Sequence, residues 1–161
     1  MGWNFALMHL GPSAQGLLHL GEDTTYEPDH DENTAWAYVD DSGTTVVTGG
    51  VFRPQAVAEL SSRTSARIVV TYFGSTGGGY GFEVHERGTV VRDIGVVQGT
   101  PTEEVGIRLP EEDLPSVTNA EFDEDRFAAL FVEAARTDSL RAIGSAAFAR
   151  VASPDLLLYL D

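Results

Sequence analysis

Residues 67–94, RIVVTYFGSTGGGYGFEVHERGTVVRDI, decide the expected fold of this chain. Residues 67–73 are rich in β-branched and aromatic side chains, residues 80–85 alternate between apolar and polar types, and residues 89–94 are again rich in valine and isoleucine. Such runs are typical of β-strands. The glycine-rich loop at 74–79 and a short turn after the second run separate the three segments. The stretch therefore predicts a three-stranded meander.

Two further strand signals precede this meander. Residues 35–39 and 44–48 have strand-like composition, and the turn residues 40–43, DDSG, lie between them, so we expect a hairpin. Residues 3–10 are apolar at nearly every position, which predicts a strand buried on both faces in the middle of a sheet.

The clearest helical pattern covers residues 123–136. Phe127, Leu130, Phe131 and Ala134 repeat there at the spacing that places them on one face of a helix. Three acidic residues open the segment and an arginine ends it, which is favourable for the helix dipole.

Other segments have weaker signals. We expect helices over residues 13–20, 54–62 and 139–151, the last following Ser139 as a cap. Residues 100–122 contain three prolines and many acids, and we expect an irregular surface segment there. Pro154 precedes an apolar terminal run that we expect to be docked.

Together these elements predict a single α+β domain over residues 1–161. Its mainly antiparallel sheet is expected to have about six strands, arranged as a ferredoxin-like or split βαβ core with an added hairpin. Helices are expected to cover the sheet, two of them from the C-terminal part of the chain.

Composition excludes several classes of function. The chain has 25 acidic residues, 10 basic residues, all of them arginine, and a formal charge of −15. Nucleic-acid binding needs a basic face, so we expect none. There are no cysteines, which excludes disulfides and thiolate chemistry. The apolar start is short and no basic residue precedes it, so we expect a cytoplasmic protein without a membrane span.

Most of the acidic residues lie in two blocks. Residues 1–52 contain eight acids and no lysine or arginine, and residues 103–125 contain nine acids and only Arg108. We expect both blocks to face outward and to attract a basic protein partner, although solubility alone would also explain them. The six acids chosen as the contact surface, called the first acidic block below, are Glu22, Asp23, Glu27, Asp29, Asp31 and Glu32.

Two other classes of function remain open. One is a small enzyme or ligand-binding domain, with a pocket between the sheet and the C-terminal helices lined by Phe73, Tyr80, Phe82 and His85. The other is a structural or assembly subunit with an apolar sheet edge. No motif identifies catalytic residues, a cofactor site or a metal site: the alternate acids at 29–33 resemble a calcium loop, but Thr34 stands where that loop needs glycine.

Three segments carry a resemblance: residues 1–10, residues 80–92 with the run Tyr80-Gly81-Phe82, and residues 104–111, EVGIRLPE. The chain resembles uncharacterised small acidic proteins of actinobacteria in these segments. Some families of this kind are immunity proteins of bacterial toxin systems. The resemblance therefore adds slight support to the binding of a partner, in the form of an immunity or inhibitor protein, and it supplies no functional residues.

Overall fold

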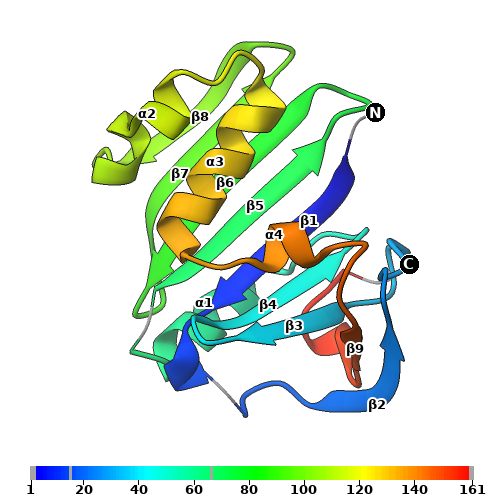
Figure 1. Cartoon of the computed structure of the whole chain (residues 1–161). Helices are drawn as coiled ribbons and strands as arrows, with labels where there is room; N and C mark the ends of the chain where they lie inside the picture. The colour runs from blue at the N-terminus through cyan, green and yellow to red at the C-terminus, as the bar shows by residue number, and fades with distance from the viewer. Residues whose placement is uncertain (1–2, 15, 66, 160–161) are drawn as a thin grey trace.

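One nine-stranded antiparallel sheet organises the chain (Figure 1). This computed structural model describes residues 3–14, 16–65 and 67–159. The order of the strands across the sheet is β2-β9-β3-β4-β1-β5-β6-β7-β8. Their bounds are β1 Asn4–Leu10, β2 Leu20–Thr25, β3 Trp36–Asp40, β4 Gly43–Thr48, β5 Ile68–Gly74, β6 Gly79–Glu86, β7 Thr89–Val97, β8 Thr100–Gly106 and β9 Phe148–Val151.

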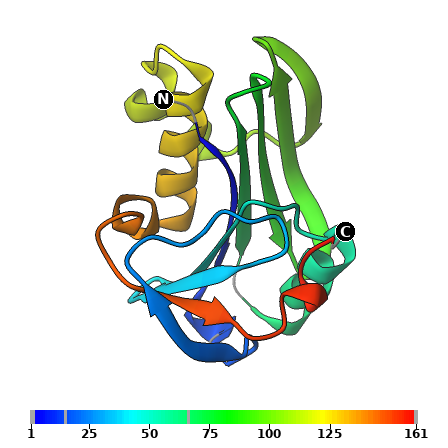
Figure 2. The same cartoon turned by 90° about the vertical axis from the view of Figure 1, so that its right-hand side faces the viewer.

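Short helices lie on both faces of the sheet (Figure 2). The α-helices are α1 Pro54–Arg63, α2 Pro115–Thr118, α3 Asp123–Ala135 and α4 Ser139–Ala142, and 3-10 turns occur at η1 Pro12–Ala14, η2 Pro110–Asp113 and η3 Pro154–Leu156. Figure 2 shows α3 on one side of the sheet, with α1 and the C-terminal η3 turn on the other. No helix in the described ranges is both long and apolar enough to cross a membrane.

The central strand β1 separates two apolar cores. Phe5 and Leu7 point into the core beneath α3, whereas Ala6, Met8 and Leu10 point into the core beneath α1. Because side chains alternate across a strand, a strand that is apolar at every position is buried on both faces. The prediction of a central strand at residues 3–10 is thus confirmed.

Several other predicted elements are also confirmed. The meander is formed by β5, β6 and β7, the hairpin by β3 and β4, and the predicted helices at 54–62 and 123–136 are α1 and α3. The hairpin turn depends on Gly43, which has a φ of +133°, and a Cβ there would collide with the backbone carbonyl of Leu10. Arg136 takes the left-handed conformation and ends α3.

The predicted sheet of about six strands on a ferredoxin-like or split βαβ plan is wrong. Nine strands are present: β8 replaces part of the expected irregular segment, β2 begins where the expected helix at 13–20 was to end, and β9 lies within the expected helix at 139–151. Edge strands such as β2 and β8 bury little side-chain surface, so their sequences need no apolar pattern. With four residues, β9 is too short to show a period.

The helical cover also differs from the prediction. Residues 12–14 form a single 3-10 turn, and α4 has only four residues, so α3 is the one long helix from the C-terminal half of the described chain. α1 links β4 to β5, which flank β1 on either side. The C-terminal segment is docked as expected, with Leu157 and Leu158 buried in the core beneath α1.

Candidate partner-binding surface

The first acidic block lies on β2, at one edge of the sheet, and on the loop from β2 to β3 (Figure 1). All six of its acids are exposed, and within the described part of the chain none of them forms a salt bridge. The predicted contact residues thus lie in one continuous segment, residues 22–32, and all six are exposed.

The backbone of this loop is held by close contact with β4. A Cβ at Gly49 would collide with the carbonyl of His30, and a Cβ at Gly50 would collide with that of Glu32. The Thr48 hydroxyl donates a hydrogen bond to the Thr34 carbonyl at 2.6 Å. The paired glycines thus let the acidic loop pack flat against the end of β4, which fixes where its carboxylates project.

Asp29 differs from the other five acids of the block. Its carboxylate accepts hydrogen bonds from the Thr34 hydroxyl at 2.5 Å and from Trp36 Nε1 at 3.0 Å. These bonds, with the nearby charge of Arg150, lower the pKa of Asp29 below its usual value. Asp29 therefore anchors the loop from within. Asp31 accepts a hydrogen bond from the Asn33 amide at 2.7 Å. None of the other five acids forms a salt bridge with a described residue, so their charges remain available to a partner.

The sequence analysis missed Tyr26, which lies between the acids of β2 and those of the loop. Its side chain is 73% exposed and makes no hydrogen bond or ring contact in the described structure. Tyrosine is enriched among the residues that dominate binding energy at protein interfaces. The available signal was a lone aromatic residue inside an acidic loop.

The second block, residues 103–125, is different because arginines neutralise several of its acids. Glu112 is buried and meets Arg92, itself 2% exposed, through Oε1–Nη2 and Oε2–Nε contacts of 2.7 and 3.0 Å. The Leu109 amide donates to the same carboxylate at 2.6 Å. Glu112 and Glu104 raise the pKa of Arg92. This pair links β7 to η2.

Other acids of the second block also have partners. Asp113 pairs with Arg108 at 2.8 Å, Glu111 with Arg67 at 3.0 Å and Asp123 with Arg126 at 3.4 Å. The second block therefore presents less free negative charge than its number of acids suggests. Among the described residues, the first block has six exposed acids and no salt bridge, whereas the second block mixes paired acids with the exposed and unpaired Glu103, Glu121 and Asp125.

The four residues predicted to line an active-site pocket do not come together. Phe73, Tyr80 and Phe82 face α3, where the Tyr80 ring stacks on Phe127 at 5.9 Å and fills the interface. His85 lies on the opposite face of β6, 2% exposed, with Nε2 3.5 Å from Glu83. Because neighbouring residues of a strand alternate between faces, Phe82 and His85 could not share a cavity in regular β6.

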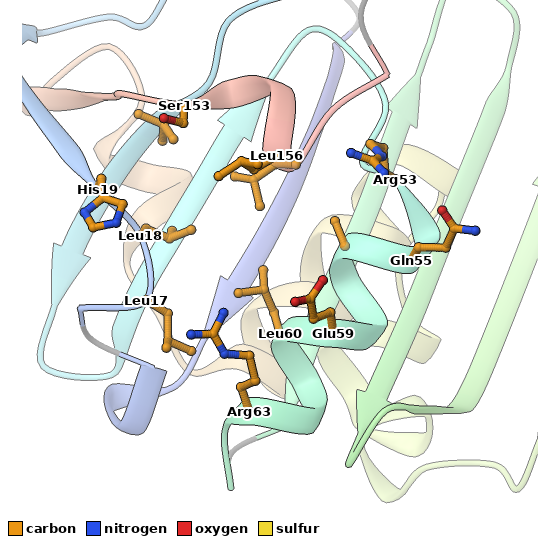
Figure 3. A pocket seen from close by; sticks show the side chains of 13 residues that line it. Leu17, Leu18, His19, Arg53, Gln55, Glu59, Leu60, Arg63, Ser153 and Leu156 are labelled. Carbon is orange, nitrogen blue, oxygen red and sulfur yellow. The ribbon is translucent and has the colours of Figure 1, made fainter.

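A cavity is present elsewhere, between α1, residues 17–19 and residues 151–157 (Figure 3). Its volume is about 350 Å³, and none of the residues predicted for a pocket lines it. Sequence reasoning missed it because its walls come from three distant segments. A second cavity of about 320 Å³ lies between α3 and the strands β7 and β8, next to Arg92.

Neither edge strand has the strongly apolar character expected of an assembly subunit. β2 reads LGEDTT and β8 reads TPTEEVG, so polar residues predominate in both. The described residues contain no group of three or more histidine or acidic side chains with the geometry of a metal site. Comparison with protein-family models, with curated proteins and with solved structures found no match.

Proposed function

We propose that this is a non-enzymatic cytoplasmic protein that binds a basic protein partner through the first acidic block. One observation supports the proposal: Glu22, Asp23, Glu27, Asp31 and Glu32 are exposed and have no counter-ion among the described residues, although many other acids of the chain are paired. An arrangement of this kind leaves negative charge available to a second molecule.

The physical role of the block would be to steer and orient the partner. Exposed charges of one sign speed the association of oppositely charged proteins by orders of magnitude at low salt, and salt screens the effect. Tyr26 would add apolar contact at the centre of the interface. Inhibition of a basic toxin, as in an immunity protein, is the form of this function that the sequence resemblance favours.

Protection of the sheet edge is a competing explanation for part of the block. Glu22 and Asp23 lie where the register of β2 with β9 is interrupted, and carboxylates and bulges on edge strands discourage edge-to-edge pairing. This explanation does not extend to Glu27, Asp31 and Glu32, which lie outside any strand. These three loop acids therefore support partner binding more specifically than the two strand acids do.

The test compares two variants with equal loss of charge. The block variant carries Glu22→Gln, Asp23→Asn, Glu27→Gln, Asp31→Asn and Glu32→Gln, and it keeps Asp29 because that side chain holds the loop. The control variant neutralises five exposed acids elsewhere, Asp41, Glu121, Asp125, Asp138 and Asp155. Both variants are used to capture proteins from extract of the source organism, beside the wild-type chain.

We expect one basic protein to be retained by the wild-type chain and by the control variant but lost with the block variant. With that protein purified, the association rate should fall at least tenfold in the block variant at low salt, with a flatter salt dependence. The thermal midpoint of the block variant should be unchanged or higher, because like charges are removed. Equal retention by all three proteins, or retention of no basic protein, would contradict the proposal.

A further inference from the structure

The cavity beneath α1 combines an apolar lining with basic groups, in a chain whose formal charge is −15 (Figure 3). Its volume of about 350 Å³ lies at the lower end of the range for small-molecule sites. Seven apolar side chains line it: Leu17, Leu18, Ala56, Leu60, Val151, Leu156 and Leu157. Leu156 is 60% exposed, so part of this apolar surface has no partner within the described chain.

Two arginines stand at the two ends of the helix that forms one wall. Arg53 immediately precedes α1 and Arg63 is its last residue, so about 15 Å of helix separates their backbones. Both guanidinium groups line the cavity, and neither forms a salt bridge with a described residue. Nη1 of Arg53 donates to the Asp155 carbonyl at 3.2 Å, which leaves its other donors free.

Glu59 is the only acidic side chain among the lining residues. Two arginines and one glutamate give the carboxylate and guanidinium groups of the cavity a summed formal charge of +1, which matches one monoanion better than a doubly charged phosphate. The apolar side chains between the arginines favour an aliphatic body over a polar one. The charges disfavour a cationic occupant.

We propose that this cavity binds an amphipathic carboxylate, a small molecule with an aliphatic chain and a single carboxylate group. The carboxylate pairs with Arg53 or Arg63, and the chain lies against the leucines between them. Arginine suits this role because its planar group binds a carboxylate through two parallel hydrogen bonds. The site uses no residue of the first acidic block, so it is independent of the proposed partner surface.

The test uses decanoate as the probe, with decanol and decylamine as neutral and cationic analogues of the same chain length. Binding to the full chain is measured by calorimetry, and the site is located by NMR shifts of Leu60, Val151 and Leu157. We expect decanoate to bind best and decylamine worst. The double variant Arg53→Gln/Arg63→Gln should weaken decanoate binding at least tenfold and leave decanol binding unchanged. Glu59→Gln should tighten decanoate binding.

Arg141→Gln is the matched control, because Arg141 is an exposed arginine of α4 that does not line the cavity. It should bind decanoate as the wild-type chain does. Arg53 is half-buried and the double variant loses its bond to the Asp155 carbonyl, so unchanged decanol binding is the measure that the cavity of that variant is intact. The proposal is overturned if the wild-type chain does not bind decanoate at millimolar concentration. It is also overturned if decylamine binds more tightly, if Arg141→Gln weakens binding equally, or if the NMR shifts occur elsewhere.

Discussion

The two acidic blocks begin on strands at opposite edges of one sheet, β2 and β8, yet their carboxylates have different surroundings. In the second block, Glu112 is buried against Arg92, and Asp113 and Glu111 meet other arginines. In the first block, Glu27 and Glu32 are exposed without a described counter-ion. The number of acids in a segment therefore does not determine its free charge; the position of the arginines in the fold does.

This difference separates structural carboxylates from available ones. A buried ion pair constrains the elements that it joins, because each partner needs the other once both have left water. An exposed acid with no partner contributes little to folding, so its retention is compatible with a role outside the folded chain. The comparison can be tested by removing carboxylates from each block in turn.

Loss of Glu112 should have the largest effect. Glu112→Gln leaves the buried guanidinium of Arg92 without its main counter-ion, and we expect the free energy of unfolding to fall by about 3–5 kcal/mol. Urea denaturation measures this fall. Glu32→Gln in the first block, where the side chain is exposed, should change stability by less than about 0.5 kcal/mol.

A second variant distinguishes loss of the pair from a general intolerance of the site. Arg92→Met/Glu112→Leu removes both charges at once, and it should recover a large part of the stability lost in Glu112→Gln. Equal destabilisation by Glu32→Gln and Glu112→Gln would abolish the distinction between the blocks.

The next largest loss of stability is expected when the packing of the acidic loop against the end of β4 is disturbed. Gly49→Ala places a methyl group against the His30 carbonyl, so the loop must move, and we expect a loss of about 2 kcal/mol in unfolding free energy. Gly77→Ala is the control, because the nearest atom to a Cβ there lies 3.9 Å away. Denaturation of both variants measures the difference, and equal stability would show that close packing does not hold the acidic loop.

Sequence patterns predicted the interior of the fold better than its edges. α3 buries apolar side chains at helical spacing, and β1 and β5 are apolar along most of their length because both of their faces are buried, so all three are visible in the sequence. β2 and β8 are defined by backbone pairing with one neighbour, and their polar side chains read as loops. β2 depends on β9, which is distant in the sequence, whereas β8 forms a hairpin with β7 across the turn Gln98-Gly99 and its polar composition hid that local pairing.

The same limit applies to the candidate sites. The lack of any arginine or lysine in residues 1–52 predicted that the acids of the first block would find no counter-ion nearby in the sequence. The neutralisation of the second block did not follow from any such local feature, because Arg92 reaches Glu112 from a strand 20 residues earlier. The position of His85 on the opposite face from Phe82 was readable from alternation along β6, and the prediction of a shared pocket overlooked it.

The half-buried carboxylates Asp93 and Glu83 differ from both blocks, because neither is fully exposed and neither forms a salt bridge with a described arginine. Removal of the Asp93 charge should give the smallest change in stability. Asp93 follows Arg92 on β7 and points to the opposite face, directly across from Glu83 on β6. Burial, with the charges of Glu83 and Glu103, raises the pKa of Asp93 to about 6. Like charges directly opposite each other destabilise a sheet.

The pH dependence follows from the direction of this shift. The folded chain holds the Asp93 proton more tightly than the unfolded chain, so the resulting stabilisation is fully present below pH 4 and is lost as pH rises through about 6. Asp93→Asn should therefore raise the free energy of unfolding by about 1 kcal/mol at pH 8, after allowance for solvent screening, and have little effect at pH 4. Urea denaturation at both pH values measures this. An equal change at the two pH values, or a loss at pH 8, would mean that Asp93 has an internal counter-ion and belongs with the paired acids of the second block.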